Sequence, residues 1–209
     1  MLPEVFGVNA WVRSVADRLA AQGHPALAVP LFSRTAPDLE LAYDASDLAE
    51  GRRHKDATTS EQILADVAAA VSWFRARYPQ AAIHVVGFCF GGHAAFLAAT
   101  LPGVEHAFDF YGAGVSRMRP GGGEPSLALL PEIKARLTCV FGTADPLIPP
   151  EDREAIGFAL SKVDPAGQRL RVVEYADADH GFMCEARSAF NPRASAQGWR
   201  LLLAGDPVA

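Results

Sequence analysis

An α/β fold with a mostly parallel sheet, covered by helices on both faces, is what the sequence predicts. Short apolar runs rich in β-forming residues alternate along the chain with amphipathic helical patterns. This alternation is typical of parallel strands joined by crossover helices. No internal repeat or low-complexity tract divides the 209 residues. We therefore expect one domain spanning residues 1–209.

The individual elements follow from composition and periodicity. Five runs have the composition of short buried strands: Ala26–Pro30, Ile83–Gly87, Ala107–Tyr111, Thr138–Gly142 and Leu170–Tyr175. Five other segments have helical patterns: Asn9–Gln22, Glu61–Arg77, Gly92–Thr100, Asp152–Lys162 and Ala194–Leu203. Two stretches are polar or rich in glycine and proline, and we expect them to be loops or excursions: Arg34–Ser60 and Ser116–Pro131.

Charge and cysteine content exclude several classes of function. The net charge of −5 argues against a nucleic-acid binder, whose binding surface would be basic, and against docking on an anionic membrane. The chain has three cysteines, Cys89, Cys139 and Cys184, and none of them forms a C-x-x-C pair. Neither a disulfide framework nor a structural zinc site is therefore expected. We expect a cytoplasmic protein without a signal peptide or a membrane span.

The sharpest motif is Gly87-Phe88-Cys89-Phe90-Gly91-Gly92, between a predicted strand and a predicted helix. It has the pattern of a nucleophile elbow with cysteine in place of serine. Small flanking residues permit the strained turn, and the following helix N-terminus favours a thiolate and a developing oxyanion. The N–H of Phe90 would be one oxyanion donor. The alternative is a buried structural cysteine in a glycine-rich turn.

Two further residues complete a catalytic constellation. Asp145 follows the strand Thr138–Gly142, and His180 follows the strand Leu170–Tyr175. Each alone has an ordinary explanation, as a turn aspartate or a surface histidine. Their order, nucleophile then acid then histidine, is that of α/β-hydrolases. The sequence therefore predicts an α/β-hydrolase fold with a Cys-His-Asp triad. The histidines lack metal-ligand spacing, and we expect no metal.

With these motifs the chain resembles the dienelactone hydrolase family over nearly its whole length. Other matching motifs are Pro3-Glu4-Val5-Phe6-Gly7-Val8-Asn9, Phe110-Tyr111-Gly112 and Asp179-His180-Gly181-Phe182. The resemblance implies that Glu4 helps to generate the thiolate of Cys89 and that the Val5 N–H is a second oxyanion donor. It also implies hydrolysis of an unsaturated lactone through an acyl-enzyme, with neither metal nor organic cofactor.

The substrate contacts depart from the family pattern. Founding members place an arginine shortly after the catalytic histidine to hold the substrate carboxylate, and here Arg187 is a displaced candidate. Tyr111 is a second candidate, through its motif. Three more arginines are candidates for a further carboxylate contact: Arg34, Arg52 and Arg53. A solvated surface arginine is the alternative for each, so the specific lactone stays open while ester-type hydrolysis is expected.

The start of the chain also departs from the family. Family members carry one to three further strands ahead of the Glu4 loop, and the last of them would lie between Ala26–Pro30 and the elbow strand. We expect a gap beside Cys89, with unpaired backbone groups that cost about 1–3 kcal/mol each. Either Met1 is an internal methionine, with upstream codons encoding an apolar β-rich run, or the chain is a truncation with a repacked site. The first explanation is favoured.

Three functions are therefore considered. The leading one is a hydrolase acting on a lactone or small carboxylic ester. The second is a carboxylesterase or thioesterase of other specificity on the same scaffold. The third is a non-catalytic, truncated remnant that binds a small molecule or a partner. The expected partner is a small-molecule substrate rather than nucleic acid or membrane, and the sequence does not specify an oligomeric state.

Overall fold

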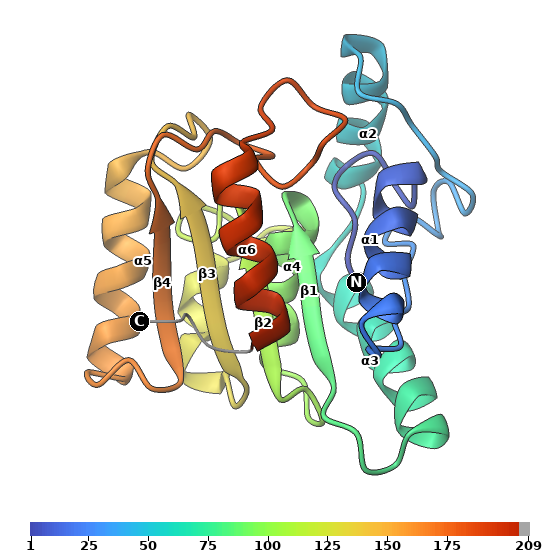
Figure 1. Cartoon of the computed structure of the whole chain (residues 1–209). Coiled ribbons are helices and arrows are strands. Elements are labelled where there is room, and N and C mark those ends of the chain that lie inside the picture. Colours follow the sequence, from blue (N-terminus) through green and yellow to red (C-terminus); the bar gives the residue numbers. More distant parts are fainter. Residues whose placement is uncertain (205–209) are drawn as a thin grey trace.

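A parallel sheet forms the centre of the molecule (Figure 1). The computed structural model describes residues 1–204. Four strands lie in the order β1-β2-β3-β4, and all neighbouring pairs are parallel. Their bounds are His84–Phe88, His106–Phe110, Arg136–Gly142 and Leu170–Tyr175. The predicted parallel sheet and four of the five predicted strands are confirmed.

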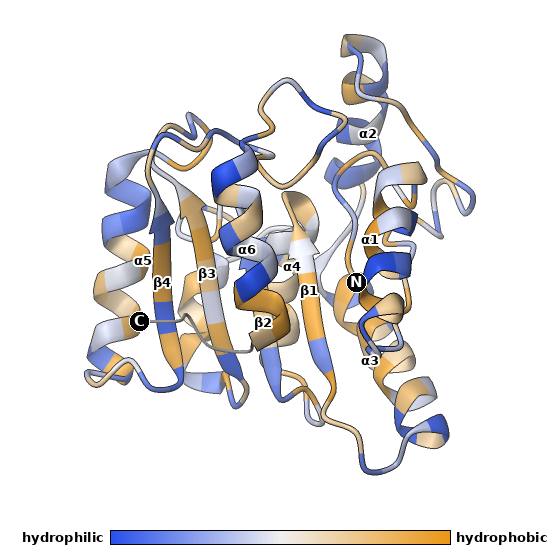
Figure 2. Cartoon of the chain, in the orientation of Figure 1, coloured by the Kyte–Doolittle hydropathy of each residue, from blue (hydrophilic) through white to orange (hydrophobic). Residues whose placement is uncertain are grey.

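Helices cover both faces of this sheet. In chain order, α1 to α6 span Ala10–Ala21, Ala45–Asp56, Ser60–Arg77, Phe90–Ala98, Pro150–Val163 and Pro192–Ala204. In Figure 1, α6 lies in front of the sheet and α4 lies behind it, against β1 and β2. Because both faces are covered, the strands are mostly apolar, as Figure 2 shows.

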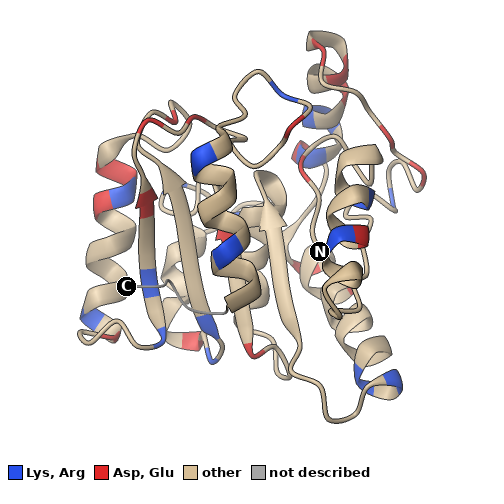
Figure 3. Ribbon diagram, in the orientation of Figure 1, with Lys and Arg blue, Asp and Glu red and all other residues tan. Residues whose placement is uncertain are grey.

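Charged residues lie mainly on the helices and loops (Figure 3). The edge strand β4 is the main exception among the strands, because Arg171 and Glu174 fall within it. Buried apolar residues from the strands and helices join in one contiguous cluster. Within residues 1–204, no helix is both long and apolar enough to cross a membrane.

The polar excursion Arg34–Ser60 contains a helix that the sequence analysis treated as loop. This helix, α2, begins after Asp44, whose side chain accepts a hydrogen bond from the Asp47 N–H at 2.8 Å. Most of its residues are polar, so it lacks the apolar periodicity on which the prediction depended. The excursion Ser116–Pro131 likewise holds the start of a short 3₁₀ helix, η1, over Ser126–Glu132.

The predicted strand Ala26–Pro30 is wrong. Among the described residues its strand-like neighbour is the short stretch Met1-Leu2: the Met1 amino group donates to the Leu27 carbonyl at 2.7 Å, and the Val29 N–H donates to the Met1 carbonyl at 2.9 Å. A strand requires a paired neighbour along its length, and two residues do not provide one. The segment therefore has the apolar composition of a strand without its ladder.

The expected gap lies elsewhere than predicted. Leu2 occupies the position beside the elbow, since its N–H donates to the Val86 carbonyl at 2.7 Å and its carbonyl accepts from the Phe88 N–H at 3.2 Å. The gap beside Cys89 is therefore closed. An open groove of about 480 Å³ lies instead along the N-terminal part of β1, lined by side chains that include Phe74, Ile83 and Leu202.

This groove predicts uneven protection along β1. The N–H and C=O of one strand residue point to the same side, so the Val86 N–H faces the groove, whereas the Phe88 N–H is bonded to Leu2. We expect the Val86 amide to exchange with solvent faster than the Phe88 amide, as measured by hydrogen-exchange NMR. Equal protection of the two amides would contradict this arrangement.

Candidate active site

Cys89 lies at the turn between β1 and α4. Its φ of 55° and ψ of −117° are strained for a residue with a side chain, and it is the N-cap of α4. The turn is possible because its neighbours are glycines: a Cβ at Gly87 would collide with the Gly91 carbonyl oxygen. Phe90 is the first residue of α4, so its N–H is one of the donors that a helix leaves without an internal partner.

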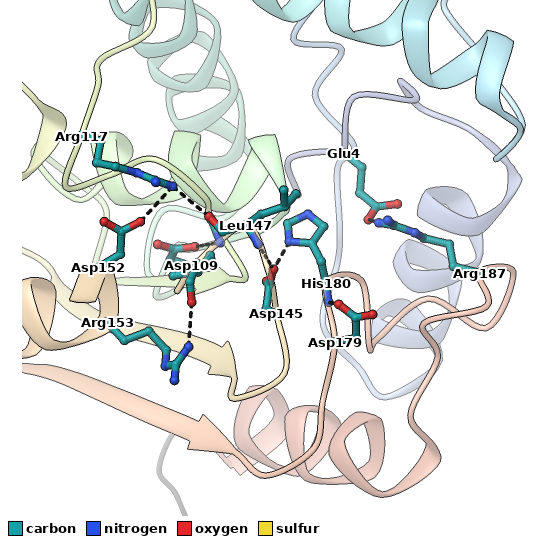
Figure 4. Close-up of polar contacts among 12 residues, drawn as sticks. Glu4, Asp109, Arg117, Asp145, Leu147, Asp152, Arg153, Asp179, His180 and Arg187 are labelled. Atoms are coloured by element: carbon teal, nitrogen blue, oxygen red, sulfur yellow. Dashed lines mark hydrogen bonds and ion pairs between the residues drawn. The ribbon is translucent and has the colours of Figure 1, made fainter. Parts of the chain in front are cut away.

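His180 and Asp145 meet beyond the ends of β3 and β4 (Figure 4). The Nδ1 of His180 lies 2.8 Å from Oδ2 of Asp145, and both residues are buried. The other oxygen of Asp145 accepts from the Leu147 N–H at 2.8 Å. Because the carboxylate accepts at Nδ1, that nitrogen carries a proton and Nε2 is left for a reacting group.

The second ring nitrogen of His180, Nε2, is the one available to Cys89. Nε2 is buried and has no well-aligned hydrogen-bond partner among the described residues. Burial lowers the pKa of His180, but the interactions with Cys89 and Asp145 outweigh it and raise the pKa to about 10. His180 is thus bonded to Asp145 and lies within electrostatic reach of Cys89.

Glu4 and Arg187 form a second pair in the same region (Figure 4). Oε1 of Glu4 accepts from Nη1 of Arg187 at 2.7 Å, and the Glu4 side chain is almost wholly buried. Burial raises the pKa of Glu4, while the charges of Arg187 and His180 act to lower it. Val5 follows Glu4 directly in the chain. A Cβ at Gly51 of α2 would collide with the Val5 carbonyl, so α2 packs closely against this loop.

The other candidate residues divide into two groups. Tyr111 is buried, has a φ of 43°, and its ring centroid lies 5.3 Å from that of His180. The three remaining arginines are surface residues, so their assignment to the substrate is not supported. Arg34 pairs with Asp66 of α3, Arg53 pairs with Glu50, and Arg52 is exposed on α2.

Sequence reasoning missed Tyr43, which lies beside Glu4. Its hydroxyl accepts a hydrogen bond from Nδ2 of Asn9 at 3.0 Å and interacts with the side chains of Glu4 and Cys184. No motif marks Tyr43, because it is a single tyrosine in a polar stretch. Only Asn9, which ends the Glu4 motif and caps α1, gave a signal nearby. Across residues 1–204, His, Cys, Asp and Glu form no cluster able to hold a metal ion.

A parallel sheet with a strained turn after β1, an acid after β3 and a histidine after β4 defines an α/β-hydrolase. Residues 1–204 match the model of the dienelactone hydrolase family. The chain therefore belongs to the dienelactone hydrolase family, and it is a hydrolase.

Individual relatives agree with this assignment. The chain is 36% identical over 202 residues to the "Putative carboxymethylenebutenolidase" of Synechocystis sp., which covers 96% of this chain and 81% of that protein. It is 30% identical over 197 residues to the "Carboxymethylenebutenolidase" of Pseudomonas putida, covering 92% and 78% of the two chains. The crystal structure of a "Putative Dienelactone Hydrolase" from Klebsiella pneumoniae superposes with a TM-score of 0.82 at 28% identity, covering 97% of this chain and 83% of that one.

The packing at the elbow predicts a large effect of one methyl group. Gly87→Ala places a Cβ against the Gly91 carbonyl, so we expect unfolding free energy to fall by about 2 kcal/mol or more in urea denaturation. Gly157→Ala in α5 is the matched control, because the nearest atom its Cβ would meet belongs to Val172, at 4.0 Å. An equal effect of the two substitutions would contradict the close approach.

The pKa values of two buried histidines are shifted in opposite directions. Burial lowers the pKa of His93 to about 4, whereas the pKa of His180 is raised to about 10. At pH 7, NMR of the ring nitrogens should therefore show His180 protonated and His93 neutral. Since the folded pKa of His180 exceeds 6.5, its stabilising contribution is complete below pH 6.5 and is lost as pH rises through about 10. A His180 that titrates near 6.5 would overturn this account.

Proposed function

We propose that the chain hydrolyses a lactone or small carboxylic ester with Cys89 as nucleophile, His180 as proton donor and then base, and Asp145 as the carboxylate that orients His180. One observation carries the proposal: His180 binds Asp145 at 2.8 Å through Nδ1 and leaves Nε2 on the side of Cys89. Family membership supports the reaction class. The named activities of the relatives in Synechocystis and Pseudomonas putida support the lactone.

The geometry supports an acyl-enzyme mechanism. The Cys89 thiolate attacks the carbonyl carbon, and the N–H groups of Phe90 and Val5 hold the resulting oxyanion. When the ring C–O bond breaks, the leaving oxygen takes a proton from His180 and an acyl-thioester remains on Cys89. Water then loses a proton to His180 as it attacks the thioester, and the carboxylic acid leaves with the thiolate restored.

Glu4 has a proposed role in preparing the nucleophile. In this structure the Glu4 carboxylate is hydrogen-bonded to Arg187, and the charge of His180 also acts on it. A substrate carboxylate that binds Arg187 would compete with Glu4 for the guanidinium. The displaced carboxylate would then be free to take the thiol proton and generate the thiolate in the presence of substrate.

Arg187 is the proposed anchor for a negatively charged substrate. Its side chain is 20% exposed, so it reaches solvent while pairing with buried Glu4. Cys89 acts electrostatically on the guanidinium, which supports a role of Arg187 close to the nucleophile. A lactone or ester with a carboxylate fits this arrangement.

The three free cysteines suit a reducing compartment, and we propose a cytoplasmic location for the enzyme.

Replacing the nucleophile tests the mechanism. With dienelactone, p-nitrophenyl acetate and a thioester as substrates, Cys89→Ala should lower kcat on the order of 10⁴-fold or more on every substrate that the wild type turns over. Iodoacetamide should alkylate half-exposed Cys89 much faster than buried Cys139 and Cys184, with parallel loss of activity. Unchanged turnover by Cys89→Ala would exclude the mechanism, and equal labelling would favour a non-catalytic remnant.

Replacing the arginine tests the substrate class. Arg187→Lys keeps the charge but alters the geometry of the guanidinium, so KM for a carboxylate-bearing lactone should rise about tenfold while KM for neutral p-nitrophenyl acetate stays close to wild type. Arg34→Lys, on the surface pair with Asp66, is the matched control. Parallel changes for both substrates would indicate an esterase of other specificity.

A further inference from the structure

The buried carboxylate of Glu4 has one satisfied oxygen and one that needs a donor. Oε1 accepts from Arg187 at 2.7 Å, whereas Oε2 has no well-aligned partner in residues 1–204. A buried carboxylate oxygen without a donor is costly, so the residues around Oε2 decide how Glu4 is held. A candidate donor is the hydroxyl of Tyr43, which acts on the Glu4 side chain.

Tyr43 is fixed in place independently of Glu4. Its ring packs edge-on against Phe6 with centroids 4.6 Å apart. The segment before it is tied to the same loop, because the Leu41 N–H donates to the Phe6 carbonyl at 3.0 Å. Tyr43 immediately precedes Asp44, the cap of α2. Packing and backbone bonds therefore hold Tyr43 against the loop that carries Glu4.

The hydrogen bonds of Asn9 determine whether the Tyr43 hydroxyl accepts or donates. Oδ1 of Asn9 accepts from the Val12 N–H at 3.2 Å, which identifies the other atom as the donating Nδ2. Nδ2 donates to the Leu41 carbonyl at 3.1 Å and to the Tyr43 oxygen at 3.0 Å. Tyr43 thus accepts from Asn9 and has one proton left to donate. Its possible acceptors are the Glu4 carboxylate and the Cys184 thiol, and a carboxylate is the stronger acceptor.

We propose that Tyr43 is a positioning residue for Glu4: its hydroxyl donates to the second carboxylate oxygen and, with Arg187, orients the carboxylate that acts on Cys89. The proposal rests on the role given to Glu4 in the proposed function. Glu4 is faced by titratable groups from three parts of the chain: Tyr43, Tyr111, His180, Cys184 and Arg187. Arg187 donates to Oε1 at 2.7 Å, and Tyr43 is the group proposed to donate to Oε2.

The consequence is a specific change in pH dependence. Burial raises the pKa of Glu4, and the Tyr43 hydroxyl is among the groups that lower it. Tyr43→Phe keeps the ring against Phe6 but removes the donor, so the pKa of Glu4 should rise. The ionised form would then be lost at a higher pH. The acid limb of the kcat/KM profile should move upward by about one pH unit, with activity on the plateau largely retained.

Tyr175→Phe is the matched control, because Tyr175 ends β4 and its ring packs on Phe182 rather than on Glu4. Wild type, Tyr43→Phe and Tyr175→Phe should unfold at similar temperatures, and only Tyr43→Phe should shift the acid limb. Superimposable profiles for wild type and Tyr43→Phe, or the same shift in Tyr175→Phe, would overturn the proposal.

A second measurement separates this proposal from the proposed function. In the Cys89→Ser background, ¹³C NMR of the Glu4 carboxyl carbon follows its titration without any turnover. The Glu4 midpoint should be about one pH unit higher when Tyr43→Phe is added. An unchanged midpoint would refute the role of Tyr43, whatever the assays show. Loss of the proposed function is detected separately, by turnover that survives Cys89→Ala.

Discussion

The close approach of backbone segments around Cys89 is the constraint on which the rest of the site depends. A side chain at Gly91 would collide with the carbonyl oxygens of Leu2 and Pro3, and one at Gly92 would collide with Asp109 and the end of β2. The elbow, the loop that carries Glu4 and the carboxyl end of β2 therefore pack without side chains between them. This contact places the strained turn of Cys89, Glu4 and Tyr111 within one small volume.

The charges in this volume are arranged as compensated pairs. Asp145 is paired with His180, and Glu4 is paired with Arg187, with three of the four side chains almost fully buried. A buried charge is stable only when it is paired and hydrogen-bonded, so each carboxylate stabilises the cation beside it. The two pairs also act on each other, since His180 lowers the pKa of Glu4. Changing one pair is therefore expected to alter the proton affinity of the other.

The sequence was sufficient for features that local chemistry determines. Buried strands are apolar along their length, and the elbow at Cys89 needs glycines, so both leave a pattern in the chain. Features that depend on a neighbour in space left none. Ala26–Pro30 has strand composition but lacks a full partner, and α2 is held by its cap and by Gly51 against Val5 rather than by an apolar face. Tyr43 could not be selected because its role depends on where Asn9 and Glu4 lie.

Arg187 shows why spacing along the chain is a poor guide to spacing in the site. The loop after His180 folds back through two successive turns. The Cys184 N–H donates to the Gly181 carbonyl, and the Arg187 N–H donates to the Cys184 carbonyl. Gly181 has a φ of 94°, and a Cβ there would lie 2.5 Å from Nη1 of Arg187. The glycine thus creates the space that the guanidinium fills. An arginine displaced along the sequence can therefore still reach Glu4, and the loop that carries the proposed base also carries the proposed substrate anchor.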